Sequence, residues 1–379
     1  MHTVARQTQQ HPDAGPARRR GATLAGRLEA LALALALALA LARAAARPAR
    51  LARQALWLLA ACLAAPACAL AQPDADADFH DKLLALGTGT EGGAFWPIGE
   101  SLCRQLNLQR AREQVRCVAS PTAGSVYNLN AVAHGRLQLG IAQEDLVLDH
   151  VAGRRGPGFD GLRLVAVLHD SPVSVVVRSS LGVQQLAQIK GLRINMGNRG
   201  SGQFTVSTAL VAALGLQERD FAAVLNEPTS AFERIFCGGR VDVVLEIVPH
   251  PVAVFEKLLA CGGRLVDLPP AVVQALVDRN PAFRAMAIPA GTYAGQTQAV
   301  RSVGVRNLLV SHARVSPVAI AKVGRVLAAQ AEALKADQPL LATMPVAPGG
   351  TAPLPAPASQ AALAPSVRLH DGLLRVQER

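Results

Sequence analysis

Short apolar runs and amphipathic runs alternate along the chain from residue 82 to about residue 285. The short runs have the length of buried strands, and the amphipathic runs carry apolar residues at helical spacing. Strands and helices that alternate in this way form a largely parallel sheet covered by helices. The pattern therefore predicts an α/β fold.

The first of these units, residues 83–106, contains a turn rich in Gly and Thr. Residues 83–87 predict a strand, and the spacing of Ile98, Leu102 and Leu106 predicts one face of a helix. The free N–H groups and positive dipole end of a helix N-terminus favour an anion. We therefore predict half of a carboxylate-binding site at this turn.

The second half of the chain repeats this arrangement. Residues 191–196 predict a strand, and residues 197–203 form a second glycine-rich turn before a helix. Predicted strands at 162–169 and 174–178 flank residues 170–172, which we interpret as a crossing between two lobes. Since ligands bind at the carboxyl ends of strands in open α/β sheets, both turns are expected to face one ligand.

Gly87, Gly89 and Gly92 also match G-x-G-x-x-G, the dinucleotide-binding fingerprint. That fingerprint requires an acidic residue near the end of the next strand, to bind the ribose hydroxyls. The next predicted strand, residues 114–119, is followed by Ser and Pro, with no acid. The sequence therefore disfavours a dinucleotide-dependent enzyme, and a tight turn with no ligand stays an alternative.

Residues 1–71 predict a secretory signal peptide with a low-complexity N-terminal extension. Arginines at 43–53 precede a Leu- and Ala-rich segment at 54–70, and Ala-Leu-Ala ending at Ala71 is a cleavage motif. These features predict cleavage after Ala71 and a periplasmic protein.

Two further features of the N-terminal region bear on membrane attachment. The Leu-Ala repeat at 31–42 is too short to span a bilayer. Residues 59–62 resemble the lipobox of bacterial lipoproteins, so lipid attachment at Cys62 stays an alternative.

The formal net charge of +11 raises the question of a nucleic-acid partner. Residues 1–71 hold nine arginines and two acidic residues, so most of the excess lies in the predicted signal region. The rest of the chain has neither a basic stripe nor interleaved aromatic residues. We predict no nucleic-acid partner.

Four cysteines follow the predicted cleavage site, an even number in an oxidising compartment. Cys103 lies in the first predicted helix and Cys117 in the next strand, whereas Cys237 and Cys261 each close a helix before Gly-Gly. Of the three possible pairings we predict Cys103–Cys117 and Cys237–Cys261, with four buried free thiols as the alternative. No C-x-x-C or His-Cys cluster indicates a metal site, and we expect no cofactor.

Seven segments, taken in order, resemble motifs of the TAXI family of solute-binding proteins, the extracytoplasmic subunits of tripartite ATP-independent periplasmic (TRAP) transporters. They are GTGTEGGAFWPIG at 87–99, AGSVYNL at 123–129, LGIAQED at 139–145, NMGNRGSGQ at 195–203, CGGRVD at 237–242, IPAGTYAGQ at 288–296 and VGV at 303–305.

This resemblance implies a type II periplasmic-binding-protein fold, with two α/β lobes joined by crossing strands and the ligand between them. Lobe 1 would comprise residues 72–170 and 300–379, and lobe 2 residues 171–299. The protein would be a monomer that captures a small acidic solute, such as glutamate, glutamine or another carboxylate, by lobe closure. It would then deliver the solute to an integral membrane permease subunit.

The chain departs from the family pattern at several positions. Glu144 replaces the usual Ser and adds a negative charge near the presumed cleft, and Arg199 replaces the usual Pro and adds a positive one. Phe95 stands in place of a frequent Tyr, and residues 368–373 only partly keep the C-terminal P-L-H-x-G-A motif. These departures leave the identity of the ligand open.

A binding protein holds its solute reversibly, so neutral donors and backbone N–H groups are expected rather than a nucleophile and base. From lobe 1 we predict Thr88, Thr90, Gly92, the amide of Gly93, Phe95, Ser125 and Asn128 as ligand-binding residues. From lobe 2 we predict Arg199, Ser201, Gly202, Gln203 and Thr205. We further predict Gln143 and Asp145 as acceptors for an amino group, and Tyr293 as a cover for the ligand.

Helix capping is the alternative role for Thr90, Ser201, Gln203 and Asp145, and a solvated loop position is the alternative for Arg199. No Ser-His-Asp arrangement is evident, and Arg and Gln replace the outer glycines of a nucleophile elbow at 199–203. We therefore predict no enzyme. A periplasmic ligand-sensing module of a signalling receptor is the alternative function.

Overall fold

The computed structural model describes residues 34–35, 82–154, 160–345 and 368–373. The predicted signal peptide, its cleavage site and the lipobox lie outside the described residues. The chain divides into two units, residues 1–73 and 74–379, and the fold below is that of the second.

Lobe 1 is built on a mixed sheet with the strand order β2-β1-β3-β10-β4. Its strands are β1 (Leu83–Gly87), β2 (Arg116–Ser120), β3 (Leu139–Gln143), β4 (Leu162–Arg178) and β10 (Val300–His312). Its helices are α4 (Phe95–Leu108), α5 (Arg110–Glu113), α6 (Ser125–Ala133), α7 (Glu144–Val151), α12 (Pro317–Ala329) and α13 (Ala331–Asp337). β1 pairs in parallel with β2 and β3, as the alternating pattern predicts, whereas β10 enters antiparallel between β3 and β4.

Lobe 2 continues the same hydrogen-bonded path as β4-β7-β5-β6. Its strands are β5 (Arg193–Asn195), β6 (Ala223–Leu225), β7 (Val243–Ile247), β8 (Gly263–Leu265) and β9 (Arg284–Ile288), and its helices are α8 (Gly202–Ala213), α9 (Phe232–Cys237), α10 (Ala253–Ala260) and α11 (Pro270–Arg279). Short 3-10 turns lie at Ser179–Leu181, Leu186–Ile189, Glu218–Asp220, Thr229–Ala231 and, in lobe 1, Pro339–Leu341.

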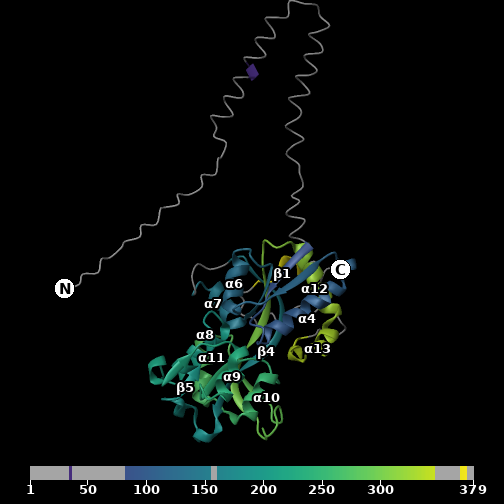
Figure 1. Ribbon diagram of the computed structural model, residues 1–379. Coiled ribbons are helices and arrows are strands. Elements are labelled where there is room, and N and C mark those ends of the chain that lie inside the picture. Colours follow the sequence, from purple (N-terminus) through teal and green to yellow (C-terminus); the bar gives the residue numbers. More distant parts are fainter. Residues whose placement is uncertain (1–33, 36–81, 155–159, 346–367, 374–379) are drawn as a thin grey trace, which may run out of the picture. The chain divides into compact units, whose positions relative to one another are not determined.

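Two long strands connect the lobes. β4 pairs with β10 up to Pro172 and with β7 from Val173 onward, while β10 pairs with β3 in lobe 1 and with β9 at its start. The elements of the two lobes form two groups in Figure 1, with β4 passing between them. The sequence prediction of two strands interrupted at 170–172 is wrong, because β4 runs through these residues and only changes its partner. The predicted two-lobed α/β fold with crossing strands is confirmed.

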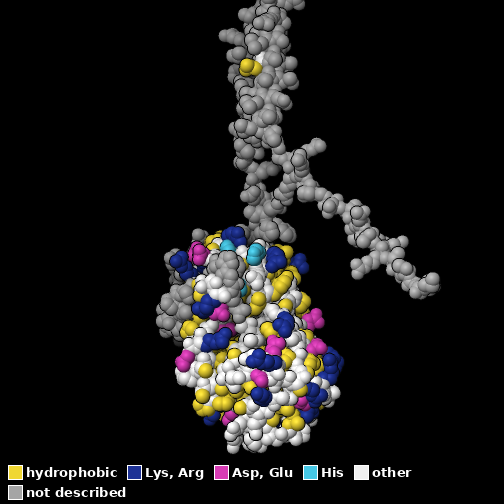
Figure 2. Space-filling view, turned by 90° about the vertical axis from the view of Figure 1, so that its left-hand side faces the viewer, with side chains coloured by type: hydrophobic (Ala, Val, Ile, Leu, Met, Phe, Trp, Pro, Cys, Tyr) yellow, Lys and Arg dark blue, Asp and Glu magenta, His cyan; other side chains and the backbone are white. Residues whose placement is uncertain are grey.

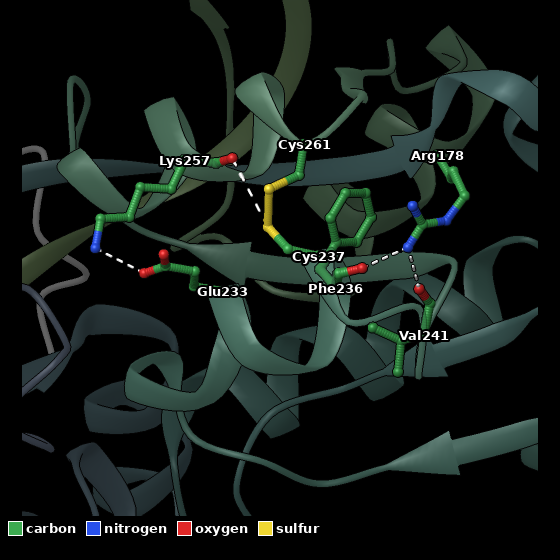
Figure 3. The surroundings of a disulfide bond; sticks show 7 residues. All are labelled: Arg178, Glu233, Phe236, Cys237, Val241, Lys257 and Cys261. Atoms are coloured by element: carbon green, nitrogen blue, oxygen red, sulfur yellow. Dashed lines mark hydrogen bonds and ion pairs between the residues drawn. A yellow bond between two sulfur atoms is a disulfide. The ribbon is translucent and has the colours of Figure 1, made fainter.

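Both predicted disulfides are present. Cys103–Cys117 joins α4 to β2, and Cys237–Cys261 joins the end of α9 to the residue after α10 (Figure 3). Each closes a loop between neighbouring elements of one lobe, so the bonds stabilise the lobes separately.

Two features bear on a membrane or nucleic-acid partner. On the face shown in Figure 2, Lys and Arg side chains are interspersed with Asp and Glu rather than gathered in a stripe. Among the described residues, no helix combines the length and the apolar content that a membrane crossing needs.

Candidate functional site

A small cavity of about 70 Å³ lies between the two glycine-rich turns. Lobe 1 lines it with Gly89, Thr90, Gly93, Ala94, Phe95, Ala123, Gly124, Ser125 and Gln143, and lobe 2 lines it with Asn198, Ser201, Gly202, Gln203, Thr229, Glu246, Ile247 and Val248. Turns separated by about 110 residues of sequence therefore share one cavity, as the repeated strand-turn-helix pattern predicts.

Three helices begin at the wall of this cavity. Phe95, Ser125 and Gly202 are the first residues of α4, α6 and α8, and all three line it. The first N–H groups of a helix have no partner within the helix, and its dipole places partial positive charge there. Gly124, immediately before α6, has φ of 104°, a conformation that favours glycine. The wall is thus built to attract an anion from both lobes.

The lobes are in contact around the cavity. Asn198 Nδ2 of lobe 2 donates to the Ala123 carbonyl of lobe 1 at 3.1 Å. A Cβ at Gly202 would collide with the side chain of Gln143, and one at Gly92 would lie 2.5 Å from Ser230 Cα. Glycine at these two positions therefore permits the close approach of the lobes.

The neutral polar side chains of the cavity differ in how far the protein already uses them. Ser201 Oγ accepts from Phe204 N at 3.1 Å and donates to Asn198 O at 2.6 Å, so it caps α8, the alternative role stated for it above. Ser125 Oγ accepts from Gln143 N at 3.2 Å, which leaves its hydrogen for another acceptor. Gln143 Oε1 is buried without a partner among the described residues.

Several residues that line the cavity were not predicted from the sequence, and Glu246 is the ionisable one among those the structure describes. Glu246, on β7, is 5% exposed and lines the cavity from lobe 2. Burial raises the pKa of its carboxyl group to about 7, against hydrogen bonds from Thr229 and Ile247 that lower it. The available signal was a glutamate inside the apolar run of residues 243–248, where a charge is costly.

A family model described as the NMT1-like family matches residues 86–350. The chain belongs to the NMT1-like family. This match covers most of both lobes and all the residues that line the cavity, so the cavity lies within the matched domain. The family and the two-lobed fold support the predicted solute-binding class rather than an enzyme.

Several solved structures are similar to this NMT1-like protein at low sequence identity. The aliphatic sulphonate binding protein SsuA from Escherichia coli has 17% identity and a TM-score of 0.39, covering 70% of this chain and 75% of SsuA. PhnD1 from Prochlorococcus marinus, solved with methylphosphonate, has 13% identity and a TM-score of 0.42, and the match covers 65% of this chain and 84% of PhnD1. A Bordetella bronchiseptica protein has 14% identity and a TM-score of 0.49, covering 79% and 98%. We transfer no ligand from similarities at this level.

Three of the predicted lobe 1 residues of the NMT1-like chain lie behind the cavity rather than on its wall. Thr88 is buried, and its Oγ1 donates to Ser120 O at 2.8 Å. Asn128 Nδ2 donates to the carbonyls of Thr88 and Ile141 at 2.6 and 2.8 Å. Thr88 and Asn128 thus hold the first turn in place, and Gly92 packs on Ser230 as described above.

Two further predicted residues line a larger opening of about 760 Å³. Asp145 at the start of α7 and Thr205 in α8 lie on its wall together with Arg154 and Arg279. Arg199 is exposed, lies 3.9 Å from Glu218 and has its guanidinium 4.9 Å from the centre of the Phe204 ring. Arg199 therefore does not line the small cavity, and a surface position, its stated alternative, describes it.

Tyr293 lies in lobe 2, on the wall of a third cavity of about 700 Å³. Its hydroxyl is 2.5 Å from His250 Nδ1 and accepts from Val252 N at 3.0 Å. Burial raises the pKa of Tyr293 to about 12 and lowers that of His250 to about 4. On the other side of the ring, His250 Nε2 is 2.7 Å from Ser174 Oγ. Ser174 is buried and lines none of these cavities, so this Ser-His pair offers no accessible nucleophile.

Glu144 does not add a free negative charge to the cavity, contrary to the sequence expectation. Its carboxylate pairs with Arg306 of β10 and Arg284 of β9, each at 2.5 Å. The side chain is 2% exposed, and the two arginines neutralise it within the protein. Among the described residues, no group of three or more His, Cys, Asp or Glu side chains could hold a metal ion.

Proposed function

We propose that this protein is the extracytoplasmic solute-binding subunit of a TRAP-type secondary transporter. It captures a small carboxylate, such as glutamate, glutamine or a dicarboxylate, and delivers it to an integral membrane permease subunit. The observation that supports this proposal is the cavity between the lobes, where α4, α6 and α8 begin.

The chemistry of the wall suits reversible binding of an anion. None of the described residues that line the cavity is Lys or Arg, so the carboxylate would be held by main-chain N–H groups and by hydroxyl groups such as those of Thr90 and Ser125. Hydrogen bonds to a charged group contribute about 1.5–3 kcal/mol each, and a few of them suffice for a tight complex.

The mechanism follows from the connection of the lobes. β4 and β10 are the long strands that run from one lobe into the other, and bending at their crossing opens the cavity. A solute that contacts both turns binds the closed form more tightly than the open one, so it shifts the population toward closure. The closed form is then the state that the membrane subunit recognises.

Titration calorimetry with glutamate, glutamine, 2-oxoglutarate, glutarate and succinate tests the proposal. We expect at least one of these solutes to bind, and we expect Thr90→Val to weaken that binding by about tenfold or more because the cavity loses a donor.

Thr208→Val is the matched control. Thr208 is exposed and lines the 760 Å³ opening, so this variant removes the same hydroxyl group from the competing location. No binding of any solute by correctly folded protein contradicts the proposal. A loss of affinity in Thr208→Val with none in Thr90→Val contradicts the assignment of the cavity.

A further inference from the structure

Glu246 occupies an unusual place for a carboxyl group. It lies within β7, between Leu245 and Ile247, in a strand whose five residues are all buried. Transfer of a carboxylate from water into such a setting is costly unless a cation accompanies it. The position therefore needs an explanation beyond sheet formation.

The described residues supply hydrogen bonds to Glu246 but no counter-charge. Oε2 accepts from Thr229 Oγ1 at 2.6 Å, and Oε1 accepts from Ile247 N at 2.9 Å. Within the described part of the chain, no Lys, Arg or His forms an ion pair with it, and Glu246 is the only ionisable side chain on the cavity wall.

Each carboxylate oxygen can accept a further hydrogen bond, and a second acceptor lies on the same wall. Gln143 Oε1 is buried and has no partner among the described residues. A carboxylate offers about four acceptor sites, of which Thr229 and Ile247 use two. The lobe 2 wall and the end of β3 thus present acceptors, while the starts of α4, α6 and α8 present donors.

We infer that Glu246 is a specificity-determining residue, which selects solutes that carry a protonated amino group as well as a carboxylate. The inference rests on the function proposed above, because the carboxylate is taken to lie at the helix N-termini. The ammonium group donates to Glu246 and Gln143 and supplies the cation that the protein lacks. Amino acids have this chemistry, whereas dicarboxylates without nitrogen place a second negative charge beside Glu246.

A purely structural role for Glu246 makes a different prediction. Burial raises its pKa to about 7, so near neutral pH a protonated carboxyl group could simply hold Thr229 and Ile247 in place. In that case removing the charge would leave the choice of solute unchanged. Pairs of solutes that differ only in the amino group distinguish the two roles.

The experiment is titration calorimetry with glutamate and glutarate, aspartate and succinate, and alanine and propionate. We expect the amino member of the best-bound pair to bind at least about tenfold more tightly to the unaltered protein. In Glu246→Gln this preference should fall below about threefold. Glu256→Gln is the control, because it removes the same charge from an exposed lobe 2 position outside the cavity.

A second measurement needs no variant. Burial raises the pKa of Glu246 to about 7, and an ammonium group bound beside it favours the ionised form, so near neutral pH the complex with glutamate should release part of a proton, read from calorimetry in buffers of different ionisation enthalpy. Glutarate should release none. Among the residues that the structure describes on the cavity wall, Glu246 alone is ionisable, so no neighbour there obscures this signal.

The outcomes separate this inference from the proposed function. Equal affinity within each pair, or a preference that survives in Glu246→Gln, overturns the role of Glu246 and leaves carboxylate binding intact. Absence of binding for all six solutes overturns the proposed function and the inference with it.

Discussion

Glu144 and Glu246 are both buried glutamates, but only Glu144 is paired with arginines. Both side chains are buried, at 1% and 5% exposure. Glu144 lies beside the crossing strand β10 with two arginines at 2.5 Å, whereas Glu246 lies on the cavity wall with two neutral donors. The protein compensates the first charge completely and leaves the second to be compensated by a ligand.

The two sites also differ in what they connect. Glu144 begins α7 in lobe 1, Arg306 lies on the strand that crosses to lobe 2, and Arg284 lies on β9, which pairs with the start of that strand. This ion cluster therefore fixes lobe 1 to the crossing region. The hydrogen bonds of Glu246 stay within lobe 2, to Thr229 in the 3-10 turn before α9 and to Ile247 in β7, so they do not connect a lobe to the crossing region.

Glu144→Gln should give the largest loss of unfolding free energy among these substitutions, and it tests the structural role of the buried ion cluster. The substitution removes the carboxylate that pairs with Arg284 and Arg306, whose side chains are 33% and 11% exposed, and breaking a buried pair by removing one partner costs about 3–5 kcal/mol. Urea unfolding at neutral pH measures the loss of unfolding free energy.

Glu233→Gln is the control for this change. Glu233 pairs with Lys257 at 2.6 Å on the surface, where both side chains are more than half exposed (Figure 3). Its loss should cost less than about 1 kcal/mol. Equal effects of the two substitutions would show that the Glu144 cluster is no stronger than a surface pair.

Removal of the Cys237–Cys261 disulfide should rank next. The two cysteines are 24 positions apart in the sequence. Replacing both by serine opens the loop between them and should lower the unfolding free energy by about 2–4 kcal/mol. Because neither Glu144 nor Glu246 lies at this bond, the loss should be the same at every pH at which the protein is folded. A loss that varies with pH would mean that the bond influences one of the buried acids.

Glu246→Gln should have an effect of the opposite sign near neutral pH. The pKa of Glu246 is raised from 4.5 to about 7, so the folded state binds this proton more tightly than the unfolded state. The stabilisation by this group is complete below about pH 4.5 and is lost as the pH rises through about 7, a change of about 3 kcal/mol. Glutamine does not titrate.

The unfolding free energy of the unaltered protein, minus that of Glu246→Gln, should therefore fall by about 3 kcal/mol between about pH 4.5 and pH 8. Thermal and urea unfolding across this range measure the difference, and the titration of other groups cancels in it. A difference that is constant with pH would contradict the buried, unpaired state of Glu246.

Ser201→Ala should change the unfolding free energy least, and it tests whether this cavity residue only caps α8 or also binds the solute. The hydroxyl group already caps α8, so its loss should cost about 1 kcal/mol of unfolding free energy and little solute affinity. If the binding free energy of the solute falls by more than the unfolding free energy does, Ser201 contacts the solute directly.

The sequence predicted the parts of this structure that repeat a local pattern. Both glycine-rich turns and the disulfide pairs follow from apolar spacing, glycine positions and the order of elements, whereas the crossing at 170–172 was placed correctly but predicted as a break between two strands. Each requires only that neighbouring strands and helices pack in their usual way, which is why the turns at Thr90 and Gly202 were predicted to share a cavity.

The residues that sequence reasoning placed wrongly or missed depend on contacts between distant segments. Glu144 was expected near the cavity because nothing local reveals Arg284 and Arg306 as its partners, more than 130 positions away. The role of Tyr293 as a cover for the solute stays a prediction, and the contact of its hydroxyl with His250 within lobe 2 could not be foreseen from the sequence. Glu246 lies in an apolar strand, and only the arrangement of the lobes shows that it lines the cavity.

A crystal structure of the protein with its tightest-binding solute tests the central claim most directly. We predict the solute between the lobes, with a carboxylate at the starts of α6 and α8 and a nitrogen within hydrogen-bonding distance of Glu246. Solute bound instead in the opening beside Asp145 or in the cavity beside Tyr293, with the space between the turns unoccupied, would contradict the account.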